Sequence, residues 1–82
     1  MEYILLFVVG QDGMITRFRI KKRLPLRKLM NTFCDLFGVV PLQALFAYNG
    51  LVIQGTDTAA SLEMHDGDAI SVYWAPSIIT PN

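Results

Sequence analysis

Residues 25–38, PLRKLMNTFCDLFG, decide the fold, because they form one amphipathic helical pattern between stretches of strand-like sequence. Five apolar residues fall at the spacing of a single helical stripe: Leu26, Leu29, Met30, Phe33 and Phe37. Pro25 suits the first turn of this helix, where its missing N–H would have no partner anyway. Gly38 is typical of the left-handed residue that ends a helix.

The sequence before this helix predicts a β-hairpin. Residues 3–9 are a β-branched and aromatic run, and the GQDG sequence at 10–13 is a turn signal. From 14 to 21 the side chains alternate in character, as in a half-buried strand. Thr16, Phe18 and Ile20 share one face of this strand, and Arg17, Arg19 and Lys21 share the other.

The sequence after the helix predicts three more strands. Residues 42–48 form the first of them, with Ala44, Phe46 and Tyr48 on one face. The Asn49-Gly50 pair is a strong signal for a two-residue hairpin turn, and it leads into a short strand at 51–53. A turn at 65–68 precedes the last strand, at 69–74.

Between the short strand and the last strand, Asp57 or Thr58 is suited to cap a short helical turn toward Leu62. The whole order, a hairpin, a helix, two short strands and a final strand, predicts a helix that crosses one face of a mixed sheet. We expect one domain at residues 1–74. Residues 75–82 contain two prolines and are expected to form an irregular tail.

The composition restricts the class of protein. Cys34 is the only cysteine, so no internal disulfide can form and a reducing compartment is the simpler interpretation. The apolar run at 3–9 has no basic leader or cleavage region and is too short to span a bilayer, so neither a signal peptide nor a membrane partner is expected. The formal net charge of zero gives no overall attraction to nucleic acid.

Hydrophobic residues make up 52% of the 82 residues. A domain of this size has a high ratio of surface to volume and cannot bury so much apolar area. We therefore expect part of the apolar surface to be exposed or covered by a partner.

The order and spacing of many turn and core residues resemble the small ubiquitin-like modifier (SUMO) family from about residue 4 to residue 73. The matching residues are Gly10-Gln11-Asp12-Gly13, Phe18-Arg19-Ile20-Lys21, Pro25-Leu26-Arg27-Lys28-Leu29-Met30, Phe33-Cys34, Gly38, Asn49-Gly50, Asp57-Thr58, Leu62-Glu63-Met64 and Asp66-Gly67-Asp68-Ala69-Ile70-Ser71-Val72. The resemblance implies an α+β fold, the ubiquitin-like β-grasp. In this fold one main helix packs on one face of a mixed sheet of four to five strands.

The resemblance also bears on covalent attachment. SUMO proteins end in Gly-Gly, and the aligned positions here are Ile78 and Ile79. The processing enzymes of the family thread the last residues through narrow channels, which β-branched side chains would block. The resemblance therefore implies a binding module that cannot be conjugated. A replaced tail is the alternative explanation.

In the SUMO family, partners insert a short apolar strand, the SUMO-interaction motif, between the second strand and the helix. Carried over position by position, this groove comprises Thr16, Phe18, Ile20, Leu29 and Phe33, with a basic rim of Arg19, Lys21 and Lys28. The partners implied are proteins with such motifs or enzymes of the SUMO pathway. The alternative is that the apolar residues are core and the charges a solvated face. All seven Lys and Arg residues lie between 17 and 28, which favours the groove.

A second surface is expected on the face of the sheet that points away from the helix. Its apolar residues would be Leu5, Phe7, Leu45, Ala47 and Tyr73, with Leu51 extending the patch. Each large side chain left in water forgoes about 1.5–3 kcal/mol of burial. Such a patch favours an interface with a partner or with a second copy, and scattered exposure is the alternative.

No catalytic or metal-binding set is recognisable. His65 falls in a polar turn and Cys34 in the helix, so both are expected to be structural, and neither enzyme activity nor a cofactor is expected. The sequence predicts a non-covalent protein-interaction module of the nucleus or cytoplasm, with the nucleus favoured by the resemblance. The alternative is an engineered SUMO-like scaffold, redesigned or selected for binding or assembly.

Overall fold

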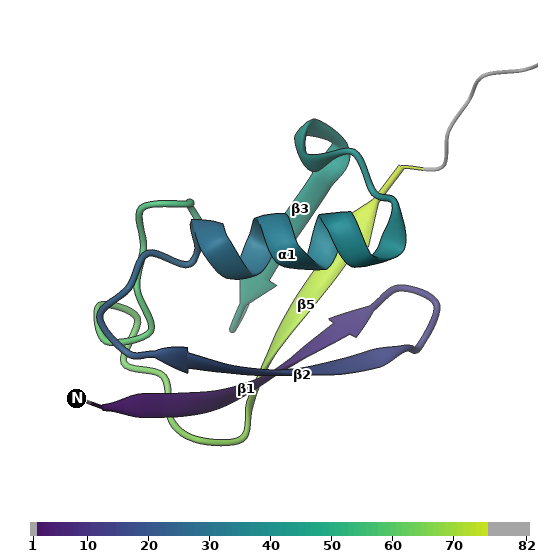
Figure 1. Cartoon of the computed structure of the whole chain (residues 1–82). Coiled ribbons are helices and arrows are strands. Elements are labelled where there is room, and N and C mark those ends of the chain that lie inside the picture. Colours follow the sequence, from purple (N-terminus) through teal and green to yellow (C-terminus); the bar gives the residue numbers. More distant parts are fainter. Residues whose placement is uncertain (1, 76–82) are drawn as a thin grey trace, which may run out of the picture.

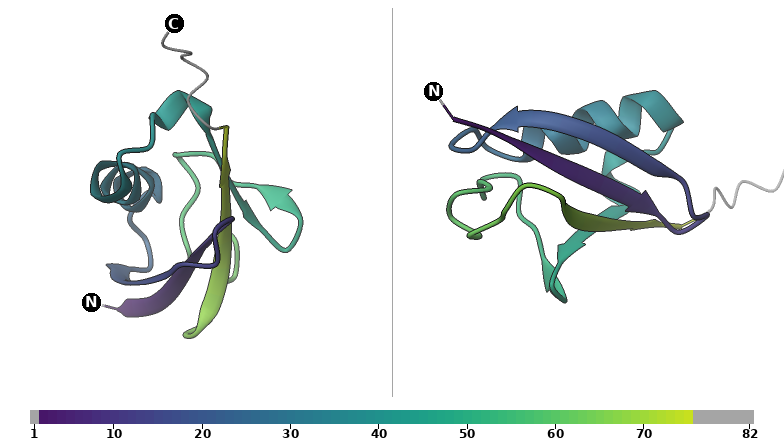
Figure 2. Two further views of the ribbon diagram at one scale, coloured as in Figure 1. Left: turned by 90° about the vertical axis from the view of Figure 1, so that its right-hand side faces the viewer. Right: turned by 90° about the horizontal axis from the view of Figure 1, so that it is seen from below.

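The computed structural model describes residues 2–75 of the chain. Its elements are β1 (Tyr3–Gly10), β2 (Ile15–Lys21), α1 (Arg27–Phe37), the short 3-10 helix η1 (Pro41–Gln43), β3 (Ala44–Tyr48), β4 (Leu51–Val52) and β5 (Asp68–Trp74). The helix α1 crosses one face of the sheet (Figure 1), and the view along its axis separates the two layers (Figure 2). This arrangement confirms the expected α+β fold. Most of the predicted irregular tail, including Ile78 and Ile79, lies outside the described residues.

The five strands form one mixed sheet in the order β2-β1-β5-β3-β4. The central pair β1 and β5 is parallel, and the other three pairs are antiparallel. The hairpin partner β2 therefore forms one edge of the sheet, and the short strand β4 forms the other.

Strand alternation places the core. Ile4, Leu6 and Val8 on β1 point toward the helix and are at most 2% exposed, as the period-two pattern predicts. The intervening side chains lie on the opposite face and are only half-buried. The complete core comprises Ile4, Leu6, Val8, Leu26, Leu29, Phe33, Cys34, Phe46, Ile53, Ala59, Met64, Ile70 and Val72.

The helix α1 begins slightly later than the sequence predicts. Leu26 is its N-cap, so Pro25 precedes the helix instead of lying in its first turn, and Pro25 forms an isolated bridge with Thr58. At the other end Gly38 has a φ of 67°, which confirms the predicted left-handed cap. Within the described residues, no helix combines the length and apolar character needed to cross a bilayer.

The segment before β3 is a correction to the prediction of a strand at 42–48. The 3-10 helix η1 occupies the start of that segment, because Pro41 suits a helical first position and Gln43 donates its N–H to the carbonyl of Val40 at 2.8 Å. Leu42 is consequently 97% exposed. The strand itself begins at Ala44.

The two turns near β4 differ in how well the sequence predicts them. The Asn49-Gly50 turn is confirmed, with φ values of 52° and 80° that match a two-residue hairpin. The helical turn expected after Asp57 forms only as hydrogen-bonded turns. There, Thr58 and Ser61 each donate a backbone N–H to the other's hydroxyl at 2.9 Å.

Candidate functional site

The edge strand β2 is incompletely covered by the helix. Phe18 and Ile20 face the helix side of the sheet, yet both are only half-buried, in contrast to the helix-facing residues of β1. Within residues 2–75, no strand pairs with the outer edge of β2. The strand therefore presents an apolar trough beside a row of backbone N–H and C=O groups that can pair with an added strand.

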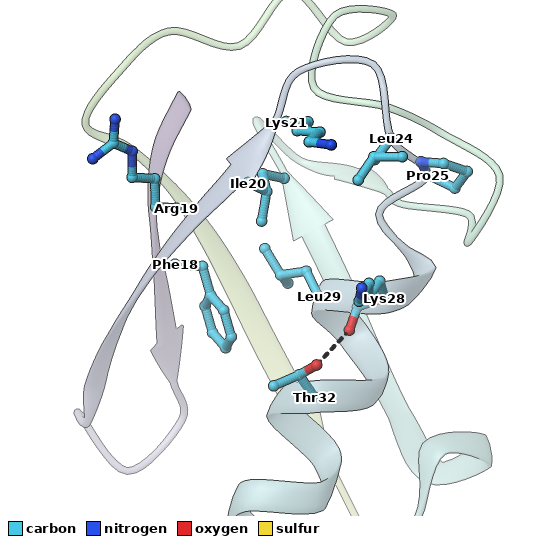
Figure 3. A pocket seen from close by; sticks show the side chains of 9 residues that line it. All are labelled: Phe18, Arg19, Ile20, Lys21, Leu24, Pro25, Lys28, Leu29 and Thr32. Atoms are coloured by element: carbon cyan, nitrogen blue, oxygen red, sulfur yellow. Dashed lines mark hydrogen bonds between the residues drawn. The ribbon is translucent and has the colours of Figure 1, made fainter. Parts of the chain in front are cut away.

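A hollow of about 250 Å³ lies between β2, the loop that follows it and the first turns of α1 (Figure 3). Its lining consists of Phe18, Arg19, Ile20, Lys21, Leu24, Pro25, Lys28, Leu29 and Thr32. Its apolar lining residues are Phe18, Ile20, Leu24, Pro25 and Leu29, of which Leu29 is only 2% exposed. Thr32 donates its hydroxyl to the carbonyl of Lys28 at 2.8 Å, so it presents its methyl and hydroxyl groups at the helix side.

Six of the eight residues expected in the groove line this hollow: Phe18, Arg19, Ile20, Lys21, Lys28 and Leu29. Thr16 lies nearer the start of β2, is half-buried and does not line the hollow. Phe33 is 2% exposed and packs inside the core, with its ring centroid 5.8 Å from that of Phe46 and 6.2 Å from that of Trp74. Phe33 therefore supports the helix from within and does not line the hollow.

Three lining residues were not anticipated: Leu24, Pro25 and Thr32. Leu24 is the one apolar residue in the otherwise basic stretch between Ile20 and Pro25, and this contrast is a signal that the sequence offers. Thr32 follows Lys28 by one helical turn, so helical spacing alone places both residues on the same face of the helix.

The expected basic rim has two different parts. Lys21 and Lys28 lie at the hollow, whereas the guanidinium of Arg19 points away from the helix (Figure 3). It lies over the ring of Tyr3, 5.3 Å from its centroid, in a cation–π contact. The charge beside the apolar trough therefore comes chiefly from the two lysines.

The outer face of the sheet combines apolar side chains from several strands. Leu5 and Phe7 pair with Arg19 and Arg17 across β1 and β2, and they are half-buried beside these long side chains. Leu45 on β3 pairs with Tyr73 on β5.

Leu45 and Tyr73 are 45% and 52% exposed, respectively. Ala47 lies beside them on β3 and pairs with Val52 of β4. Leu51 pairs instead with Tyr48 and lies on the other face, so Val52, not Leu51, extends the patch.

The titratable groups with shifted pKa values are structural. Asp68 accepts hydrogen bonds from the hydroxyl of Tyr48 at 2.6 Å and from the backbone N–H of His65 at 2.8 Å. The Tyr48 bond, followed by the backbone bond, lowers the pKa of Asp68, and the same Tyr48 bond raises the pKa of the phenol. Burial, and then the charge of Asp35, raise the pKa of the Cys34 thiol, which keeps it protonated and unreactive.

Several known proteins are similar to this chain. The family model described as Ubiquitin-2 like Rad60 SUMO-like matches residues 4–73. Small ubiquitin-related modifier 3 of Xenopus tropicalis is 46% identical over 72 residues, which cover 88% of this chain and 77% of the relative. Small ubiquitin-related modifier 4 of Homo sapiens is 44% identical over 76 residues, which cover 93% of this chain and 80% of the relative.

The fold also matches a solved structure, the ubiquitin of Caldiarchaeum subterraneum, with a TM-score of 0.85 and 16% identity. The superposition covers 94% of this chain and 99% of that one, which confirms the ubiquitin-like β-grasp. The sequence relatives are modifiers rather than enzymes, in agreement with the expectation that the chain has no enzymatic activity.

Proposed function

Because this chain belongs to the SUMO-like family of ubiquitin-fold proteins, we propose that it is a non-covalent protein-interaction module. The groove between β2 and α1 binds an extended peptide with apolar residues and acidic flanks, as found in SUMO-interaction motifs. The partners are proteins that carry such motifs or enzymes of the SUMO pathway. The observation that carries this proposal is the open edge of β2 beside the half-buried Phe18 and Ile20.

The physical basis is strand addition. Backbone hydrogen bonds to β2 provide affinity that is largely independent of sequence, and Phe18, Ile20 and Leu29 select for apolar side chains. Lys21 and Lys28 speed the encounter with an acidic peptide and set its orientation. Outward-facing arginines on β2 disfavour pairing of this edge with the same edge of a second copy, since like charges would face each other.

Calorimetric titration with an acid-flanked peptide rich in Val and Ile tests this function. Replacement of Phe18→Ala together with Lys21→Glu removes an apolar contact and reverses one charge at the hollow. We expect affinity to fall by more than about tenfold, since burial of such a side chain contributes about 1.5–3 kcal/mol. The matched control is Ile15→Ala with Arg17→Glu, on the same strand but away from the hollow, and it should change affinity by less than about threefold. Undiminished binding by the first variant would exclude the groove.

A second interface is proposed on the outer sheet face, at Leu5, Phe7, Leu45, Ala47 and Tyr73. Its support is the exposure of Leu45 and Tyr73 together with the half-buried Leu5 and Phe7 on the same face, although Ala69 and Ser71 of β5 separate the two pairs. Apolar side chains on an exposed sheet face are candidates for an interaction site. We propose that this face mediates self-association.

The proposed role is non-covalent. No two of the six glycines in the 82 residues are adjacent. We further propose a reducing compartment, the nucleus or the cytoplasm, with the nucleus favoured by the family. The single buried thiol of Cys34 is compatible with such a compartment.

A further inference from the structure

The groove is electrically asymmetric along its length. β2 and α1 run in opposite directions (Figure 1), so Lys21, at the end of β2, lies near Lys28, at the start of α1. At the opposite end of the groove, α1 carries Asp35 and has no basic residue in its last turn. The negative end of the helix dipole adds to that charge. An acidic segment of a bound peptide is therefore favoured at the Lys21 end.

A second hollow of about 560 Å³ adjoins this positive end. It is lined by Glu2, Lys21, Arg23 and Leu24, and two of these residues, Lys21 and Leu24, also line the first hollow. The two hollows therefore meet at Lys21 and Leu24, at the end of β2.

The charges of the second hollow favour an acidic occupant. Its one acid, Glu2, lies 3.9 Å from the ammonium of Lys22 and is partly neutralised by it. Lys21 and Arg23 form no ion pair with any acid in the described part of the chain. The hollow therefore has two cations available to a bound peptide and one acid that opposes it.

We propose that the peptide groove continues past the end of β2 into this second hollow, and that an acidic flank of the extended peptide lies there against Lys21 and Arg23. An extended chain advances about 3.3 Å per residue. A peptide paired with β2 as far as Lys21 therefore needs only a few further residues to reach Arg23. This inference rests on the proposed function, because it assigns a direction and a longer footprint to the same bound peptide.

Three peptides with one shared Val/Ile core test the inference. The first has neutral flanks, the second has an Asp/Glu flank before the core, and the third has the same flank after it. Dissociation constants are measured at low ionic strength, where surface charges are least screened. We expect one of the two acidic peptides to bind more tightly than the other, and the favoured one reports whether the peptide runs parallel or antiparallel to β2.

Variants of exposed residues then locate the flank. Arg23→Ala should weaken the favoured acidic peptide by about twofold to fivefold and leave the neutral peptide unchanged. Glu2→Gln should have the opposite effect and increase the affinity for the favoured acidic peptide. The matched control is Arg17→Ala, which removes the same charge from β2 far from the second hollow, and it should cost less than Arg23→Ala.

The outcomes separate this inference from the proposed function. If no peptide binds, both fail. If the core binds but neither flank improves affinity, or if Arg17→Ala costs as much as Arg23→Ala, the groove stands and the second hollow is excluded as its extension.

Discussion

Asp68 is the side chain that joins β5, β3 and the turn before β5. Its carboxylate accepts the hydroxyl of Tyr48 from β3 and the backbone N–H of His65 from the turn. Both donors favour the charged form, which is why the pKa of Asp68 is lowered. Because the folded pKa lies below the ordinary value of 3.8, this stabilisation is present above pH 3.8 and is lost as pH falls through the folded pKa.

The Asp68→Asn variant should therefore be less sensitive to acid than the unmodified protein. We expect the variant to have a lower free energy of unfolding than the unmodified protein at pH 7. The difference between the two free energies should narrow as pH falls below 3.8. Urea unfolding over a pH series measures this, with Asp35→Asn on the exposed face of α1 as control. A gap that stays constant from neutral to acidic pH would contradict the assignment.

Gln11 is a second residue with a structural role that its type alone does not reveal. Its side-chain amide donates to the carbonyl of Trp74 at 2.9 Å and accepts the N–H of Trp74 at 3.0 Å. The turn between β1 and β2 is thereby fixed to the end of β5. The side-chain amide of Gln11 thus pairs with the backbone N–H and C=O of Trp74, as a neighbouring strand would.

Loss of these two hydrogen bonds should destabilise the domain. Gln11→Ala is expected to lower the free energy of unfolding by about 1–2 kcal/mol, since each net bond contributes about 0.5–1.5 kcal/mol and both are exposed. Gln54→Ala serves as the matched control, because the Gln54 side chain makes no hydrogen bond within the described residues. Equal unfolding free energies for the two variants, measured in urea, would argue against the Gln11 contact.

At the level of elements, the helix α1 depends on its left-handed C-terminal residue. Gly38→Ala places a Cβ atom at a φ of 67° and should lower the free energy of unfolding by about 1 kcal/mol. Gly38→Asn should cost less, because Asn tolerates this conformation better. Chemical denaturation of both variants tests the point, and an Ala variant as stable as the wild type would show that the cap carries no strain.

The elements also show where sequence patterns suffice. Alternation in β1 and β2 and the helical stripe were enough to bring Phe18, Ile20 and Leu29 to one trough. Alternation also explains why the guanidinium of Arg19 points away from the hollow that this residue lines: Arg19 lies on the face opposite that of Phe18 and Ile20.

Other features depend on tertiary packing that no local pattern contains. The helical stripe cannot distinguish Phe33, which is buried, from a residue at the rim, because both have the same spacing. Leu24 lines the hollow because of the path that the chain takes from β2 to α1. The strand predicted at 42–48 begins only at Ala44, because Pro41 and the local hydrogen bond of Gln43 favour η1.

For the molecule as a whole, the outer sheet face accounts for part of the large apolar fraction. If it mediates self-association, Leu5→Lys with Phe7→Lys should convert an associating protein into a monomer, because charged side chains oppose burial of the face. The matched control is Leu36→Lys with Leu42→Lys, two exposed positions on α1 and η1, which should leave association unchanged. Sedimentation equilibrium over a concentration series measures the mass. A wild-type chain that is monomeric throughout would exclude this interface.

The distribution of charge explains how a chain of zero net charge can select an acidic partner. All seven basic residues lie between 17 and 28, on β2, the following loop and the start of α1, and all seven acids lie outside that range. Lys21 and Lys28 therefore place positive charge beside the hollow, where it can attract an acidic peptide although the net charge of the chain is zero.

The most direct test of the proposed function is an NMR titration of the isotope-labelled domain with an acid-flanked, Val/Ile-rich peptide. We predict that the largest backbone shifts fall on β2 and on the first turns of α1, at Phe18, Ile20, Lys21 and Leu29, and that β3 and β4 change little. Shifts confined to the outer sheet face, or no shifts at millimolar peptide, would contradict a peptide-binding groove between β2 and α1.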